Sequence, residues 1–296
     1  MTDNRYSVLI VGAGKVGTAV GNLLYKKGHR LVAAVATSKA SLDRAALFLP
    51  GARLLQDGTG IAGEADVILI TTKDGQIKAA CDHLVRSSSI KPSHTIIHMS
   101  GAASLDLLSS AKEAGAEIAS LHPIQSFASI ELAIESLPGS YFGLTAEGPA
   151  KAVTLQIAQD LNGRVVEIAD KDKPLYHAAA CVASNYLVTL LYIAEEVYKA
   201  AGLREDTAIE AMMPLVKGTL ANIESVGTTS ALTGPISRGD VKIVEQHLRS
   251  LRRLDGDIID TYRALGLRTI DIAVKSGTLD SEVADKLSAV LKDSGD

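Results

Sequence analysis

Three glycines near the N-terminus form the strongest motif in the chain, because of the elements expected on either side of them. Gly12, Gly14 and Gly17 are spaced as G-x-G-x-x-G, directly after the apolar run at residues 8–11. Between a strand and a helix, such glycines allow a tight turn, let the backbone approach a pyrophosphate, and let the helix pack closely on the strand. The N-terminus of that helix would favour phosphate binding. The alternative is a tight turn that binds no ligand. The residues expected to form a dinucleotide site are Gly12, Gly14, Lys15, Val16 and Gly17.

The residues after the second predicted strand bear on which nicotinamide cofactor this site would take. NAD sites usually carry Asp or Glu there, about 20 residues after the glycines, to bind the ribose 2′-hydroxyl. This chain instead reads Thr37, Ser38 and Lys39, and its first acid is Asp43. Hydroxyls and a positive charge would attract a 2′-phosphate, which an acid would repel. We therefore expect NADP rather than NAD; the alternative is that Lys39 is solvated and that either cofactor binds.

Polar residues also follow three later apolar runs. Thr72 and Asp74 follow the first, His98 and Ser100 end the second, and His122 ends the third. Ligands of parallel sheets bind beyond the carboxyl ends of the strands, so these side chains should meet in one crevice. We expect Thr72 and Asp74 to line the nicotinamide ribose, unless Asp74 only caps a helix. Single histidines are usually structural, but two at corresponding strand ends favour a functional role.

An uncharged stretch at residues 175–194 carries a polar stripe. It holds no Asp, Glu, Lys or Arg, and it is long enough to cross a bilayer. Its polar residues lead us to expect a buried helix of a soluble protein instead. His177, Cys181, Ser184 and Asn185 would share one face of that helix. Buried polar groups must be hydrogen-bonded, so the stripe either forms an internal network or meets a ligand.

A loop at residues 232–240 offers a further anion-binding group. Gly234, Pro235 and Gly239 should give it an irregular backbone, and Arg238 presents a guanidinium that suits a carboxylate or phosphate. The alternative is that Arg238 forms an internal salt bridge that holds the loop. Asp240 is expected to cap the helix that follows.

The apolar patterning predicts the elements that position these residues. Strands and helices alternate as far as about residue 170, and only helical patterns follow. We therefore predict an α/β, Rossmann-like, doubly wound and mostly parallel sheet over residues 1–170, and an all-α domain over residues 171–296. The predicted strands are 8–11, 31–35, 66–71, 95–98, 118–121, 141–144 and 165–168. The predicted helices are 15–27, 41–49, 76–86, 105–114, 150–161, 174–201, 205–223, 240–254, 257–275 and 280–292.

Composition excludes several classes of protein. The 296 residues are 47% hydrophobic, so disorder is excluded as the main state. A net charge of −4 and 4% aromatic residues argue against a nucleic-acid binder. Cys81 and Cys181 lie far apart and outside any C-x-x-C, so neither a disulfide framework nor structural zinc is expected. The first apolar run is too short for a signal peptide, and we expect a cytoplasmic protein with no membrane partner.

Together these motifs resemble the Rossmann-like proteins whose C-terminal domain is of the DUF2520 type. The architecture is also similar to the group of 6-phosphogluconate, β-hydroxyacid, pyrroline-5-carboxylate and ketopantoate reductases. That resemblance implies NAD(P)-dependent hydride transfer at the domain interface, a helical substrate domain, and homodimers with intertwined helical domains. Some proteins of the narrower type are thought to be ketopantoate reductases. The matching residues are 12–17, 71–76, 98–101, 121–123, 176–179 with Ser184 and Asn185, and 233–235 with 238–240.

One departure from the larger group affects the expected mechanism. Many members carry Lys-x-x-x-Asn on the first helix of the second domain, and the lysine donates a proton; here Cys181 stands four residues before Asn185. We therefore expect His122 or His177 to protonate a small oxo or imino acid that accepts the hydride, while Asn185 orients it. The other class left open is a non-catalytic NADP(H) sensor or assembly protein. A metal site at the histidines lacks short ligand spacing. The residues expected to bind the substrate are Ser100, Ser184 and Arg238, and its carboxylate would be held by Arg238 or by Ser184 and Asn185.

Overall fold

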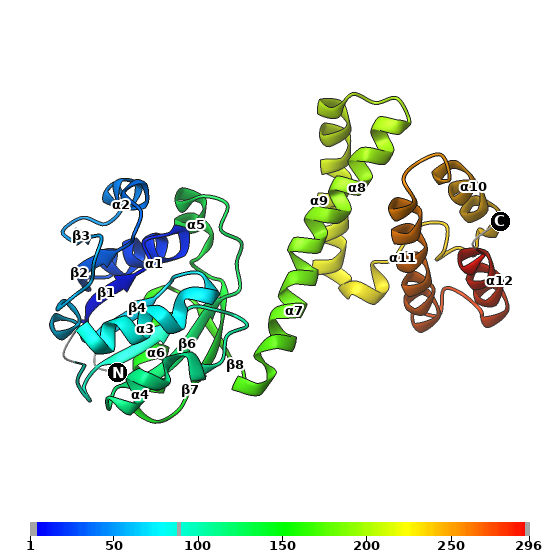
Figure 1. Cartoon of the computed structure of the whole chain (residues 1–296). Coiled ribbons are helices and arrows are strands. Elements are labelled where there is room, and N and C mark those ends of the chain that lie inside the picture. The colour runs from blue at the N-terminus through cyan, green and yellow to red at the C-terminus, as the bar shows by residue number, and fades with distance from the viewer. Residues whose placement is uncertain (1–4, 88–89, 294–296) are drawn as a thin grey trace. The chain divides into compact units, whose positions relative to one another are not determined.

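The computed structural model describes residues 5–87 and 90–293, and the chain divides into two compact units. The first unit, Met1–Asn185, holds the sheet and the helices around it, and the second, Tyr186–Asp296, holds helices (Figure 1). An α/β domain of the Rossmann type followed by a helical region is the predicted fold class, and it is confirmed.

Eight strands form one sheet in the order β3-β2-β1-β4-β5-β6-β7-β8. The chain runs outward from β1 to β3, returns to β4 beside β1, and then runs outward on the other side, which is the doubly wound arrangement. Every neighbouring pair is parallel except β6 with β7. The strands are β1 (Ser7–Val11), β2 (Arg30–Val35), β3 (Arg53–Leu55), β4 (Val67–Ile70), β5 (Thr95–His98), β6 (Glu117–Pro123), β7 (Tyr141–Ala146) and β8 (Arg164–Glu167).

Both faces of this sheet are covered by helices. Val8 and Ile10 of β1 belong to an apolar cluster that α1, α2 and α6 complete, whereas Leu9 and Val11 belong to one that α3 and α4 complete. A strand buried on both faces is a continuous apolar run, because successive side chains point to opposite faces. The helices of this unit are α1 (Lys15–Lys26), α2 (Lys39–Ala46), α3 (Ile77–Ser87), α4 (Ser109–Glu113), α5 (Ile130–Ser136), α6 (Gly148–Asp160) and α7 (Lys173–Ala183).

Two short elements were not predicted, and one predicted helix is composite. The three residues of β3 are too few for a pattern to stand out, and α5 follows a polar loop that masks its start. The predicted helix at 105–114 begins as a 3₁₀ turn, η3 (Leu105–Leu108), and continues as α4. Further 3₁₀ turns are η1 (Ala62–Glu64), η2 (Asp74–Gln76) and η4 (Asp170–Asp172).

The long helix predicted at 174–201 is interrupted. Ser184, with φ −117° and ψ −65°, separates α7 from α8 (Asn185–Ala200). The compact units divide after Asn185 rather than at residue 170, so α7 belongs with the sheet. The expected burial of residues 175–194 is wrong for this chain, because α8 has no buried residue and α7 buries only Lys173. The stretch Asp170–Ala200 is long and apolar enough to cross a membrane by length and composition alone.

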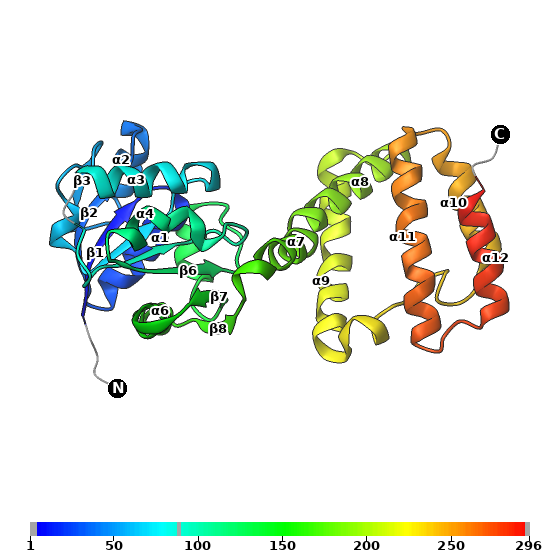
Figure 2. The ribbon, with the colours of Figure 1, turned by 60° about the horizontal axis from the view of Figure 1, so that its bottom comes forward.

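The second unit has its own apolar core. Val244 and Leu248 of α10 pack with Ile270 of α11 and with Leu287 and Leu291 of α12, and Figure 2 shows these three helices side by side. Its helices after α8 are α9 (Glu205–Ser230), α10 (Val241–Leu251), α11 (Gly256–Lys275) and α12 (Ser281–Lys292).

One predicted helix cap in this unit is wrong. The Asp240 side chain does not cap α10. Its carboxylate instead accepts a hydrogen bond from the Nε of Arg238 at 3.1 Å, because the loop turns these two side chains toward each other.

Candidate functional site

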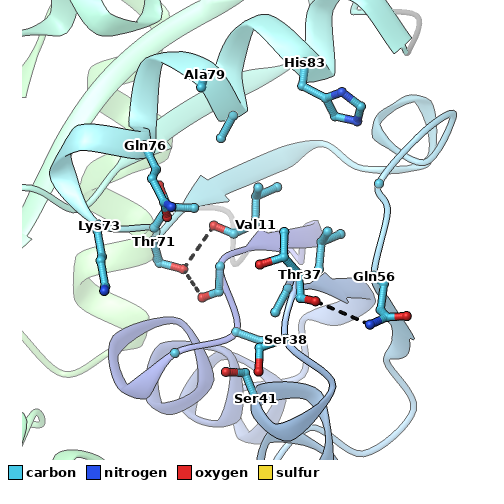
Figure 3. A pocket seen from close by; sticks show the side chains of 18 of the residues that line it. Val11, Thr37, Ser38, Ser41, Gln56, Thr71, Lys73, Gln76, Ala79 and His83 are labelled. Carbon is cyan, nitrogen blue, oxygen red and sulfur yellow. Dashed lines mark hydrogen bonds between the residues drawn. The ribbon is translucent and has the colours of Figure 1, made fainter.

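A cleft of about 710 Å³ lies at the carboxyl edge of the sheet, beside the ends of β1, β2 and β4. Its size is in the range typical of ligand-binding pockets. Figure 3 shows Thr37, Ser38 and Ser41 on one side, with Thr71 and Gln76 on another. The predicted residues that line it are Gly12, Gly14, Thr37, Ser38 and Thr72, together with Lys73 and Gln76 of the same predicted loop; the lining residues that sequence reasoning missed include Ser41, Gln56, Asp57 and His83.

The three glycines of the first turn have three different environments. Gly12 has φ +111°, and a Cβ there would lie 2.7 Å from the carbonyl carbon of Thr71. A Cβ on Gly17 would collide with the Thr71 hydroxyl, which donates to the Gly12 carbonyl oxygen at 2.7 Å. Gly14 has no atom within 4 Å of such a Cβ, so the backbone there faces open space. Gly12 therefore fits a tight turn, Gly17 fits close helix packing, and Gly14 leaves room for a ligand.

The neighbouring residues of the turn begin α1. Lys15 is exposed, and Val16 is partly buried against the core. As first-turn residues they contribute backbone N–H groups at the helix N-terminus, which is the part of a helix that binds phosphate.

Lys39 is not among the described residues that line the cleft. Its ammonium forms an ion pair with Asp43 at 2.8 Å, and its side chain is 79% exposed. The two residues are four apart on α2 and therefore neighbours on the helix surface. The hydroxyl of Ser41, rather than the charge of Lys39, accompanies Thr37 and Ser38 in the lining.

The far side of the cleft carries a hydrogen-bonded pair that the sequence did not suggest. Nε2 of His83 on α3 lies 3.0 Å from a carboxylate oxygen of Asp57, which follows β3. The hydroxyl of Thr59, then His83, lowers the pKa of Asp57. No local spacing signals this pair, because its members come from separate elements.

The β4 end contributes Thr72 and Asp74. Thr72 lines the cleft, and its hydroxyl is buried without a hydrogen-bond partner among the described residues. Asp74 is exposed at the start of η2. Its negative charge raises the pKa values of His122 and Lys173 against the larger effect of burial.

A cluster of aromatic and imidazole side chains lies at the ends of β5 and β6, within the first unit. Nδ1 of His122 is 2.8 Å from the Tyr176 hydroxyl. The ring of His177 meets that of His122 edge-on, with centroids 5.7 Å apart. A Cβ on Gly101 would lie 2.7 Å from Nδ1 of His177 and 2.8 Å from Cε1 of His122. Glycine at this position therefore lets both rings approach the backbone that follows β5.

The environment of His122 keeps its ring uncharged near neutral pH. Burial first, then the charges of His177 and Lys173, lowers the pKa of His122 to about 4. Burial raises the pKa of Tyr176 to about 12, and the backbone of Gly143 hydrogen-bonds the tyrosine oxygen. We assign the Tyr176 hydroxyl as the donor to Nδ1 of His122, which leaves the ring proton on Nε2.

His98 and Ser100 are buried beneath this cluster. Nδ1 of His98 accepts the backbone N–H of Ser100 at 3.2 Å, and burial lowers the pKa of His98 to about 3. The hydroxyl of Ser100 accepts the N–H groups of Ala102 and Ala103 at 3.3 and 3.0 Å. The Ser100 side chain thus shapes the loop that carries Gly101.

Lys173 and Asp170 attach α7 to the sheet, and sequence reasoning selected neither as a site residue. Lys173 donates from Nζ to the Ser100 carbonyl oxygen at 3.1 Å and to the Ser120 hydroxyl at 2.5 Å. Asp170 accepts the Ser104 hydroxyl at 2.6 Å and the N–H of Leu105 at 3.0 Å. The sequence does place Lys173 next to the site, because it stands four residues before His177 and hence on the same helical face.

Two family comparisons cover most of the chain. Residues 1–123 match the family described as a Rossmann-like domain, and residues 140–269 match a domain of unknown function, DUF2520. Both matches agree with the resemblance inferred from the sequence. His122 and Gly101 lie in the first match, whereas Tyr176 and His177 lie in the second, so the imidazole cluster draws on both. A search of curated proteins finds no match.

Solved structures share this fold over nearly their whole length. A candidate NADP oxidoreductase from Bacteroides fragilis is 22% identical, with a TM-score of 0.73, over 92% of this chain and 100% of that chain. A protein from Thermotoga maritima is 25% identical, with a TM-score of 0.73, over 90% of this chain and 99% of that chain. A pyrroline-5-carboxylate reductase from Coxiella burnetii is 17% identical, with a TM-score of 0.59, over 97% of this chain and 99% of that chain.

The other site residues predicted after His177, namely Ser184, Asn185 and Arg238, are exposed in the single chain. The helix breaks at Ser184, so the predicted stripe does not share one continuous helical face, and both Ser184 and Asn185 are exposed. Arg238, in the second unit, is 64% exposed and paired with Asp240 at 3.1 Å. No group of three or more metal-ligating side chains is found within residues 5–87 and 90–293.

Proposed function

We propose that this protein is an NADP-dependent reductase of a small oxo or imino acid. The observation that carries the proposal is the position of the His122–Tyr176–His177 cluster at the same sheet edge as the glycine turn and its cleft. The named activities of the Bacteroides and Coxiella structures support the same class of reaction.

The cleft fits the proposed cofactor. Gly14 leaves open space where a pyrophosphate would approach, and the first turn of α1 supplies N–H groups. Thr37, Ser38 and Ser41 supply hydroxyls where NAD sites usually carry an acid. We therefore assign a 2′-phosphate to these three hydroxyls rather than to Lys39. When bound, the reduced nicotinamide would supply a hydride to the C=O or C=N carbon of the substrate.

The two histidines of the cluster have different proposed roles. Because His122 is uncharged near neutral pH, it serves as a hydrogen-bond donor from Nε2 that polarises the substrate oxygen or nitrogen. We assign proton delivery to His177, whose Nδ1 is buried without a partner among the described residues and lies beside Gly101. Tyr176 fixes the orientation of His122. Substrate contacts by Ser100, Ser184, Asn185 and Arg238 stay predictions.

A substrate panel tests this function. NADPH oxidation is measured with 2-oxo acids and with cyclic imino acids, and the reactive compound is then used in single-turnover assays of His122→Ala and His177→Ala. Both variants should retain NADPH binding and lose most of the rate. Full rates in both variants contradict the histidine roles. Tight NADPH binding with no oxidation by any compound favours the alternative, a non-catalytic NADP(H) sensor.

We also propose a homodimer formed through the helices. Many large apolar side chains of α7, α8 and α9 are exposed, including Leu175, Val182, Val188, Tyr192 and Leu215 at 77%, 60%, 67%, 60% and 65%. Exposed apolar patches of this kind mark interaction surfaces in stable proteins. A second copy of the same helices would cover them, as the resemblance to dimeric reductases implies.

A further inference from the structure

Lys173 is a buried lysine with an unusual set of partners. It is the first residue of α7, only 2% exposed, and its ammonium donates to the Ser100 carbonyl oxygen and the Ser120 hydroxyl. Both hydrogen-bond partners are uncharged, although burying an ammonium is unfavourable unless its hydrogen bonds are satisfied. Burial lowers the pKa of Lys173 to about 8, and the negative charges of Asp170 and Asp74 only partly oppose this. A methionine or leucine would fill the same space without that penalty, so packing alone does not account for a lysine here.

Its hydrogen bonds join the three segments that carry the imidazole cluster. Ser100 immediately precedes Gly101, against which both imidazole rings pack. Ser120 stands two residues before His122 on β6, so their side chains share one face of the sheet. Tyr176 and His177 follow Lys173 by three and four residues and therefore share its helical face.

We propose that Lys173 is a positioning residue of this site, whose hydrogen bonds to the ends of β5 and β6 hold His177 on α7 in register with His122 on the sheet. This inference rests on the reductase function proposed above. Lys173 acts through the two histidines and is not assigned a contact with substrate.

The charge of Lys173 also affects the pKa of His122. The charged or titratable groups that act on His122 are His177, Lys173 and Asp74, its direct partner is Tyr176, and the buried His98 also interacts with it electrostatically. His177 and Lys173 lower the pKa of His122, whereas Asp74 raises it. Removal of the ammonium should therefore raise the pKa of His122 and bring its protonation closer to neutral pH.

The test compares Lys173→Met with Lys171→Met. Methionine keeps the length and the apolar stem of the lysine, and Lys171 is an exposed neighbour in the same segment. We expect Lys173→Met to bind NADPH as the parent does, to lose about 10- to 100-fold in kcat, and to show a smaller change in KM, because a displacement near 1 Å is enough for such a loss. Lys171→Met should match the parent. Ser120→Ala, which removes one partner, should lose part of the rate.

The titration of His122, followed by NMR, is the readout that a merely structural role would not move. Its midpoint should rise in Lys173→Met and stay unchanged in Lys171→Met and Ser120→Ala. An unchanged kcat or an unchanged midpoint in a folded, NADPH-binding Lys173→Met protein overturns the inference. If the parent protein reduces no compound at all, the proposed function fails, and the NMR titration still decides whether Lys173 controls His122.

Discussion

At the residue scale, the chemistry of the site depends on groups that are kept neutral by burial. The pKa values of His98 and His122 are lowered to about 3 and about 4, in both cases chiefly by burial. In an unfolded chain a histidine titrates near pH 6.5. Between roughly pH 6.5 and 4, the unfolded chain therefore binds protons that the folded chain does not.

This difference predicts a loss of stability in mild acid. The contribution of each group is fully present above about pH 6.5 and decreases as the pH falls, by at most about 1.4 kcal/mol per pH unit. His98→Asn should show a shallower dependence of the free energy of unfolding on pH between 7 and 5, measured by urea denaturation. His247→Asn, at an exposed position beside the uncharged Tyr262 hydroxyl, is the control. Equal slopes in His98→Asn and the parent would refute the assignment of a neutral, buried His98.

Residue-scale sequence reasoning found the histidines but not their partners. His122 and His177 were predicted because they stand at a strand end and on a polar helical stripe. Tyr176 was not selected, because nothing in its own spacing distinguishes it from a core aromatic residue. The role of Lys39 at the cofactor stays a prediction. Its pairing with Asp43 was not foreseen, because it depends on where α2 begins, and sequence patterns define helix starts poorly.

At the scale of elements, the turn between β1 and α1 determines whether a dinucleotide can approach the sheet. The packing of the protein itself requires glycine at positions 12 and 17, because a Cβ on either would collide with Thr71. Gly14 has free space around it and matters only for the ligand. The three positions can therefore be separated experimentally.

Alanine at each position should give two distinct outcomes. Gly12→Ala and Gly17→Ala should lower the free energy of unfolding by about 1–3 kcal/mol even without cofactor, because the backbone or the helix must shift. Gly14→Ala should leave unfolding nearly unchanged and weaken NADPH binding. Thermal unfolding and fluorescence titration measure the two effects. A Gly14→Ala protein that is as destabilised as Gly12→Ala would show that this reading of the turn is incorrect.

The element pattern was predictable wherever apolar runs were long and bounded by glycine, proline or polar residues. That applies to the buried strands β1, β4 and β5 and to most helices. The break at Ser184 was not predictable, because the apolar pattern continues through it without glycine or proline. The attachment of α7 to the sheet depends on Lys173 and Asp170, whose partners lie more than 50 residues away in sequence.

At the scale of the whole molecule, a single chain leaves large apolar side chains of α7, α8 and α9 exposed. The polar residues of the uncharged stretch 175–194 led to the prediction of a buried helix, but α8 has no buried residue in the single chain. The proposed homodimer would explain why these apolar side chains are exposed in one copy, because a second copy would cover them.

Assembly can be tested with one substitution and a matched control. Val188→Glu, at a position 67% exposed on α8, should convert a dimer into a monomer in analytical ultracentrifugation, because it would bury a charge in the interface. Leu47→Glu, at a position 78% exposed in the sheet unit, should leave the dimer intact. A parent protein that is monomeric at all concentrations, or that floats with lipid vesicles, would contradict the proposal.

In the proposed reaction, NADPH bound at the glycine turn donates a hydride to a small oxo or imino acid beside His122 and His177. The most direct measurement uses NADPH deuterated at the nicotinamide C4 and analyses the products of the substrate panel by mass spectrometry. We expect one class of compound to gain one deuterium on carbon with the parent protein and much less with His177→Ala. If NADPH binds but no compound acquires deuterium, the proposed hydride transfer is contradicted.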